Sequence, residues 1–145
     1  MTDLRLDVTK TIHAPIEKVF DAWLDPERLK QFMMPAANMP QPEVSNDARK
    51  GGKFSIIMHV GENKVAHTGE YLELDRPSKL VFSWNSPCSA EGSTVSIYFK
   101  QLDSENTEVK LSHVKFIDKQ TQQDHHNGWQ RILGHLDELC HCAVA

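Results

Sequence analysis

The chain has 145 residues, 39% of them hydrophobic and 25% charged, which is long enough for one domain with a hydrophobic core and too apolar for a disordered protein. A formal net charge of -4 and the lack of any lysine- and arginine-rich run exclude a nucleic-acid-binding protein, because phosphates call for a basic surface. Three cysteines make no disulfide framework, no apolar run approaches the ~20 residues of a membrane span, and no secretory signal is visible, so we expect a cytoplasmic protein.

Residues 4–33 predict one strand followed by two short helices. Apolar and polar residues nearly alternate over residues 4–12, which is typical of a strand. Apolar residues at helical spacing over residues 16–24 predict an amphipathic helix, and Pro15 suits its first position. Asp25 and Pro26 then form a helix start, since aspartate can cap the N-terminus and proline tolerates the first position. A second short helix with its own apolar face therefore follows.

From residue 43 to residue 116 the apolar residues recur with the period of two that is typical of β-strands. Turn-forming residues separate the strands at 61–63, 75–78 and 103–106. Successive strands joined by short turns predict an antiparallel meander with one covered face.

The last part of the chain returns to helical spacing. Its apolar residues fall on one stripe of a long helix: Trp129, Ile132, Leu133, Leu136 and Cys140. Such a helix needs a long apolar partner, and the concave face of the sheet is the candidate. No internal repeat or linker interrupts the chain, so we expect a single domain over residues 1–145.

Histidines and cysteines are concentrated in residues 125–142 and suggest a metal site, but their spacing argues against one. Cys140 and Cys142 point apart on a helix, where chelation needs a spacing of three or four residues. His59 and His67 lie on neighbouring strands and could approach each other, without a visible third ligand. We therefore expect no metal and no cofactor.

Catalytic motifs are equally weak. The sequence has no GxSxG, no glycine-rich phosphate loop and no HExxH. Cys88 lies in a predicted loop without an obvious base and is interpreted as an inert thiol. Asp47 and Arg49, two residues apart on an extended segment, are interpreted as a structural ion pair.

Taken together, several short matches, in order along almost the whole chain, resemble the START-like SRPBCC superfamily, and within it the branch homologous to the activator of heat shock protein 90 ATPase. These matches are IHAP at 12–15, VFDAW at 19–23, DPE at 25–27, DxRxGGxF at 47–54, GxY at 69–71, LVFSW at 80–84, TEVxL at 107–111 and HxxGW at 125–129.

The resemblance implies an α+β helix-grip fold, in which a curved antiparallel β-sheet wraps around a long C-terminal α-helix and two short helices follow the first strand. Where relatives often carry tryptophan after the second short helix, this chain has methionines at positions 33 and 34. Because methionine is adaptable, a relative's ligand preference should not be transferred to this chain.

A twisted sheet cannot pack evenly along a helix, so we expect an apolar cavity between the two, with tyrosine, histidine and indole groups as polar handles. For Phe54, Phe82 and Leu133 plain core packing is favoured, whereas for Trp129 core and ligand contact are evenly balanced. The candidate ligand-binding residues are Trp23, Phe32, Met34, Phe54, Ile56, Met58, Tyr71, Phe82, Trp84, His113, Trp129 and Leu133.

Three functions stay open at this point. The first is non-catalytic binding of a hydrophobic small molecule or lipid in the cavity. The second is a protein-interaction module with a chaperone as partner. It rests on the analogy with the chaperone activator, and such an analogy carries little weight because fold does not imply function. The third is a cyclase- or hydrolase-like enzyme that uses His113 or Tyr71, ranked last because neither shows an orienting partner. A homodimer is compatible with each of them.

Overall fold

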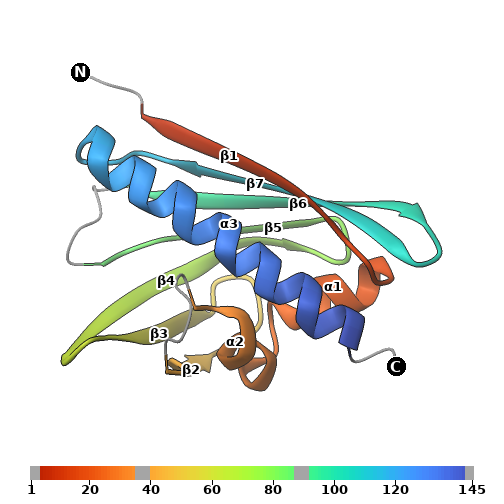
Figure 1. The fold of residues 1–145 in the computed structure, drawn as a ribbon, viewed down its shortest axis with the longest axis horizontal. Helices are drawn as coiled ribbons and strands as arrows, with labels where there is room; N and C mark the ends of the chain where they lie inside the picture. Colours follow the sequence, from red (N-terminus) through yellow and green to blue (C-terminus); the bar gives the residue numbers. More distant parts are fainter. Residues whose placement is uncertain (1–3, 35–39, 87–91, 143–145) are drawn as a thin grey trace.

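The computed structural model describes residues 4–34, 40–86 and 92–142, which form one curved sheet around one long helix (Figure 1). The elements in chain order are β1 (Arg5–Ile12), α1 (Ile16–Ala22), α2 (Pro26–Phe32), β2 (Glu43–Asn46), β3 (Lys53–Val60), β4 (Asn63–Asp75), β5 (Lys79–Ser83), β6 (Thr94–Asp103), β7 (Asn106–Val114) and α3 (Lys119–Cys142). The predicted helix-grip fold is confirmed.

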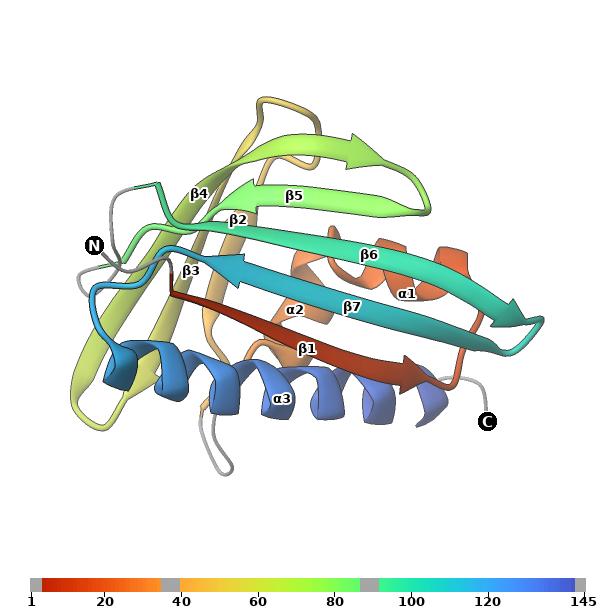
Figure 2. The same cartoon turned by 90° about the horizontal axis from the view of Figure 1, so that it is seen from above.

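All seven strands of the sheet pair antiparallel, in the order β1-β7-β6-β5-β4-β3-β2. Figure 2 shows α3 running along one side of the sheet beside β1, with α1 and α2 behind the strands. The chain thus places its first strand next to its last and packs the C-terminal helix along the first.

The apolar stripe of α3 forms the centre of the core. The five residues predicted for it are all at most 3% exposed: Trp129, Ile132, Leu133, Leu136 and Cys140. Each large aliphatic side chain buried in this way contributes roughly 1.5–3 kcal/mol relative to leaving it in water. The helix is therefore held mainly by packing against the sheet and not by its own propensity.

The two short helices begin close to where the sequence predicts. Asp25 caps α2, because its side chain accepts a hydrogen bond of 3.0 Å from the backbone N–H of Glu27, and Pro26 occupies the first helical position. Pro15 is the residue before α1 and not its first residue, a shift of one position. Both helices pack near the C-terminal half of α3 and close that end of the fold (Figure 1).

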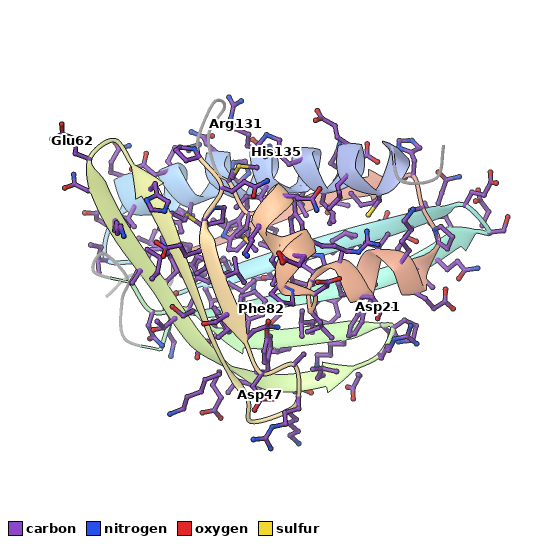
Figure 3. All side chains as sticks on the ribbon, turned by 90° about the horizontal axis from the view of Figure 1, so that it is seen from below. Asp21, Asp47, Glu62, Phe82, Arg131 and His135 are labelled. Carbon is purple, nitrogen blue, oxygen red and sulfur yellow. The ribbon has the colours of Figure 1, made fainter. Side chains whose placement is uncertain are left out.

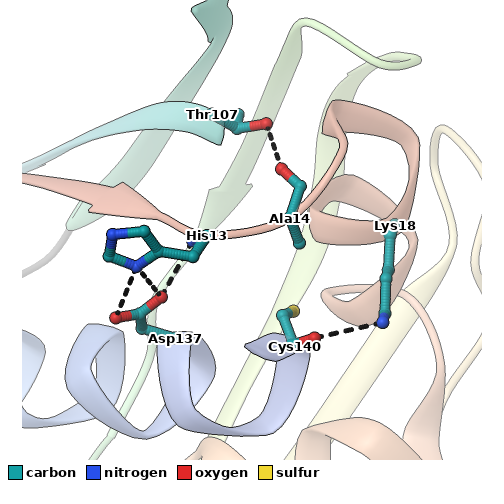
Figure 4. A network of polar contacts seen from close by, with 6 residues as sticks. All are labelled: His13, Ala14, Lys18, Thr107, Asp137 and Cys140. Carbon is teal, nitrogen blue, oxygen red and sulfur yellow. Dashed lines mark hydrogen bonds and ion pairs between the residues drawn. The ribbon is translucent and has the colours of Figure 1, made fainter. Parts of the chain in front are cut away.

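Polar contacts fasten the connection between β1 and α1 to its neighbours (Figure 4). The backbone N–H of His13 donates to Asp137 Oδ1 on α3 at 2.9 Å, and its ring Nδ1 lies 2.9 Å from the same oxygen. Lys18 Nζ donates to the carbonyl of Cys140 at 3.1 Å, and the buried Thr107 hydroxyl donates to the carbonyl of Ala14 at 2.8 Å. These bonds set the position of the last turns of α3 against both α1 and the sheet.

Charged residues lie at the rim of the sheet, and apolar side chains fill its inside. Figure 3 shows Glu62 at the β3–β4 turn, Asp47 near the β2–β3 turn and Phe82 in the interior. Asp47 forms the predicted ion pair, since its Oδ2 lies 2.6 Å from Arg49 Nε. Over the described part of the chain, every helix is too short or too polar to cross a membrane.

Candidate functional site

A cavity of about 200 Å³ lies between the N-terminal half of α3 and the β3–β4 hairpin. α3 packs closely along β1, whereas β3 and β4 lie further from the helix (Figure 1). The sheet thus curves away from α3 at one end, and side chains do not fill the space. The described residues that line it are Met58, Val65, His67, Trp84, Asp124, His125, Gly128, Trp129 and Ile132.

Simple periodicities bring these residues together. On β4, Val65 and His67 are two residues apart and share a face, and Met58 of β3 pairs directly with Val65. Four of the five described lining residues from α3 lie at the first, fourth, fifth and eighth positions of one helical stripe: His125, Gly128, Trp129 and Ile132. The fifth, Asp124, precedes His125 at the edge of this stripe. Trp84 follows directly after the end of β5.

Aromatic rings form the inner wall of the cavity. The ring centroid of Trp84 lies 4.9 Å from that of His67 and 5.1 Å from that of Trp129. Burial lowers the pKa of His67, so its imidazole is neutral at physiological pH. The wall therefore offers flat, uncharged rings to whatever occupies the space.

Trp129 is held in place by His113, a residue behind the wall. The indole N–H of Trp129 donates to His113 Nδ1 at 3.0 Å, and His113 Nε2 lies 2.7 Å from the hydroxyl oxygen of Ser93. Because an indole nitrogen can only donate, Nδ1 is the acceptor and Nε2 carries the proton. Burial, with a smaller effect from the neighbouring His125, lowers the pKa of His113 to about 3. His113 is thus a neutral support of Trp129.

Two groups in the lining lack hydrogen-bond partners. Among the described residues, Trp84 Nε1 and His67 Nδ1 are buried and pair with nothing. Buried polar atoms without partners are uncommon in folded proteins and call for an explanation.

The solvent side of the cavity is more polar. Asp124 is exposed, and its Oδ1 accepts a hydrogen bond of 2.9 Å from Gln120 Nε2. His125 is half-buried, and its Nδ1 lies 2.9 Å from the carbonyl of Thr121 on the preceding turn, which makes Nδ1 the donor.

The twelve residues predicted from the sequence fall into three groups. Met58, Trp84 and Trp129 line the cavity. A second group surrounds a space of only about 10 Å³, barely enough for one water molecule: Trp23, Phe54, Ile56, Tyr71 and Phe82. A third group lines neither space: Phe32, Met34, His113 and Leu133.

Tyr71 of the second group is held by Asn46, whose Nδ2 donates to the phenol oxygen at 3.1 Å, and burial raises the pKa of the phenol. Of the third group, Phe32, His113 and Leu133 are completely buried, and Met34 is half-buried.

Six lining residues were not in the predicted set, although the sequence carried a signal for most of them. Extending the apolar stripe of α3 back by one turn reaches Gly128 and His125, and Ile132 already lies on it. The alternation that leads to Tyr71 on β4 includes His67 and Val65. Asp124 had no such signal, because an exposed aspartate on a helix is ordinary.

The suspected metal ligands are not assembled. In the part of the chain that the structure describes, no three histidine, cysteine, aspartate or glutamate side chains come together. His59 and His67 do not approach each other as the sequence suggested: His67 points inward with Ile56, its partner across β3, whereas His59 points outward to Glu43, with 3.3 Å between Nε2 and Oε2. Cys88 lies outside the described residues.

A curved antiparallel sheet that grips a C-terminal helix, with a partly apolar cavity between them, defines a START-like helix-grip domain. The sequence comparison makes the assignment more specific. A profile of the family described as Activator of Hsp90 ATPase homolog 1-like protein matches residues 13–141, so the chain belongs to this family. No curated protein matches the chain closely enough in sequence to add a relative.

Solved structures support the same fold. An AHSA1-like protein from Aeromonas hydrophila is similar with a TM-score of 0.82 and 22% identity, over 97% of this chain and 94% of the other. A protein from Chromobacterium violaceum has a TM-score of 0.79 and 22% identity, over 94% of this chain and 96% of the other. A Plasmodium falciparum protein described as an HSP90 activator has a TM-score of 0.75 and 23% identity, over 94% of this chain and 95% of the other. At these identities the likeness concerns the fold alone.

Proposed function

We propose that this protein binds a small, mostly apolar ring compound in the cavity between α3 and the β3–β4 hairpin. The observation that carries the proposal is the cavity itself, about 200 Å³ in volume and walled by Trp84, Trp129 and His67. An apolar cavity of about 150 Å³ is enough to hold benzene, whereas sites for drug-sized ligands measure about 300–1,000 Å³. The size therefore favours one substituted ring over a lipid chain.

The chemistry of the lining supports the same class of ligand. Met58, Val65 and Ile132 offer aliphatic surface, and the indole rings offer faces for offset or edge-on stacking, worth about 0.5–1.5 kcal/mol beyond area burial. The unpartnered N–H of Trp84 belongs to this wall and would gain from a hydrogen-bond acceptor after a small ring movement.

A thermal-shift series with ring-sized compounds tests the proposal. Ligands that bind only the folded state raise its melting temperature with increasing concentration. Val65→Phe, which places a larger side chain at the cavity, should abolish the shift. Val44→Phe is the matched control, because Val44 is also a half-buried strand valine packed against the core but does not line the cavity. A flat response of the wild-type protein to a broad set of ring compounds would contradict the proposal.

A second candidate function is a co-chaperone-like module. It is favoured by the family match and by the fold shared with the Plasmodium falciparum protein described as an HSP90 activator. Under this alternative the purified chain should stimulate the ATPase of an Hsp90 chaperone from the same cells. A chaperone ATPase rate that does not change over a wide range of chain concentrations would remove this candidate.

The geometry gives the enzymatic alternative no support at the two residues considered for it. Both ring nitrogens of His113 are occupied by Ser93 and Trp129, and His113 does not line the cavity. Tyr71 faces the space of about 10 Å³, which excludes a substrate.

A further inference from the structure

The formal charge carried by the described lining of the cavity is of one sign, negative. Asp124 is its single formally charged lining residue among those described, and no described lysine or arginine lines it. The stretches outside the description, residues 1–3, 35–39, 87–91 and 143–145, contain neither lysine nor arginine in the sequence. Among the described residues, a ligand inside therefore meets aromatic rings, aliphatic groups and one carboxylate.

Asp124 lies where a ligand's tail would emerge. It is exposed, whereas Trp129 and Ile132 on the same helix are buried, so the carboxylate lies on the solvent side of the cavity. Gln120 donates one hydrogen bond to it, and no ion pair of the described residues includes it. Its charge is thus not neutralised by a neighbouring cation.

We propose that the cavity selects its ligands by charge, admitting ring compounds with a neutral or cationic tail and excluding carboxylates, and that Asp124 is the residue that sets this preference. This inference rests on the proposed function. A carboxylate drawn in would lose hydration without gaining a cationic partner, and it would lie near a like charge. An ammonium tail would instead face the carboxylate and the electron-rich faces of the indoles.

Three probes that share one phenyl ring on a short tail separate these cases: phenethyl alcohol, phenethylamine and phenylacetate. Their affinities are measured by isothermal titration calorimetry at about pH 8, above the usual titration range of imidazole, so that histidines add no charge. We expect the amine to bind about 3-fold more tightly than the alcohol, and phenylacetate at least about 10-fold more weakly, as for one partly exposed charge a few ångströms away.

Asp124→Asn should remove the higher affinity of phenethylamine relative to the alcohol, and it should reduce the difference in affinity between the alcohol and phenylacetate. The affinity for the alcohol itself should not change. Glu138→Gln is the control, since it removes one negative charge from an exposed position of the same helix that does not line the cavity. Equal effects of the two variants would overturn the role of Asp124. If Asp124→Asn fails to fold, added salt with the wild-type protein serves instead, because screening should shrink the difference between amine and carboxylate.

The outcomes distinguish the two proposals. Phenylacetate binding as tightly as the alcohol would overturn charge selection and leave the proposed cavity function standing. Failure of all three probes to bind would overturn the cavity function and the inference with it.

Discussion

His113 illustrates how a buried histidine can serve a site without touching its ligand. It was predicted as a polar handle inside the cavity, yet it lies behind Trp129 and orients the indole through one hydrogen bond, while Ser93 satisfies its other nitrogen. The sequence could indicate that position 113 faces inward, because strand alternation requires it. It could not indicate which of the inward rings would stand between His113 and the cavity.

The burial of His113 predicts a pH-dependent stability. Its pKa is about 3 in the folded protein, against an ordinary value of 6.5. Between these values the unfolded chain binds a proton that the folded protein does not, so stability rises with pH in this window and falls as the pH is lowered. Above about pH 6.5 His113 is neutral in both states and does not lower stability. When the pH falls to about 5, the unfolding free energy decreases by about 2 kcal/mol because of this residue.

Urea unfolding of the wild-type protein and of His113→Gln at about pH 7.5 and about pH 5 checks this prediction. The variant lacks the titrating group, so its stability should fall by about 2 kcal/mol less between the two conditions. A residual fall is expected in both proteins, since burial also lowers the pKa of His67. Parallel losses in the two proteins would show that His113 is not the titrating group.

At the level of elements, the helices and strands were predictable, and their spacing from one another was not. The stripe of α3 and the alternation of β3 and β4 follow from side-chain periods of 3.6 and 2 residues. Whether α3 touches β4 depends on how far seven strands twist and curve, which no local pattern encodes. The twelve candidates consequently included residues from both ends of the core. Met58, Trp84 and Trp129 line the cavity, whereas the space around Phe54 and Phe82, for which core packing was favoured, is almost solid.

Two glycines in different elements should respond oppositely to alanine. A Cβ at Gly69 on β4 would lie 2.0 Å from the carbonyl oxygen of Ser83, which is backbone and cannot move aside. A Cβ at Gly134 on α3 would meet nothing within 4 Å. We expect Gly69→Ala to lower the unfolding free energy by about 3 kcal/mol, and Gly134→Ala to raise it by about 0.5–1 kcal/mol because alanine is the better helix former.

Thermal melts of the two variants measure the difference. For a domain of roughly this size, 1 kcal/mol corresponds to a shift of about 2–4 °C. A Gly69→Ala protein as stable as the wild type would mean that β4 and β5 can separate locally without loss. A destabilised Gly134→Ala protein would mean that α3 is constrained at this turn by more than its contacts with the described residues.

Over the whole molecule, one hydrophobic core continues from a densely packed end beside α2, the solid end, to the end that contains the cavity, the hollow end. At the solid end, Leu29 of α2 and Met33, the residue after α2, lie beside Trp23 and leave a space of about 10 Å³. None of the described helices fills the corresponding place beneath the β3–β4 hairpin, and the cavity of about 200 Å³ results. The same aromatic network spans both ends, since the ring centroids of Trp23 and Trp129 are 6.4 Å apart.

This continuity predicts that the chain unfolds as one cooperative unit, as the expectation of a single domain requires. Its three tryptophans, Trp23, Trp84 and Trp129, all lie in this network, so their fluorescence reports on the core, while far-ultraviolet circular dichroism reports on the sheet and helices. In urea the two signals should change with the same midpoint and slope, as for a two-state domain. If the fluorescence change came first, the hollow end would be opening separately, and the wall of the proposed binding site would then be less stable than the rest of the fold.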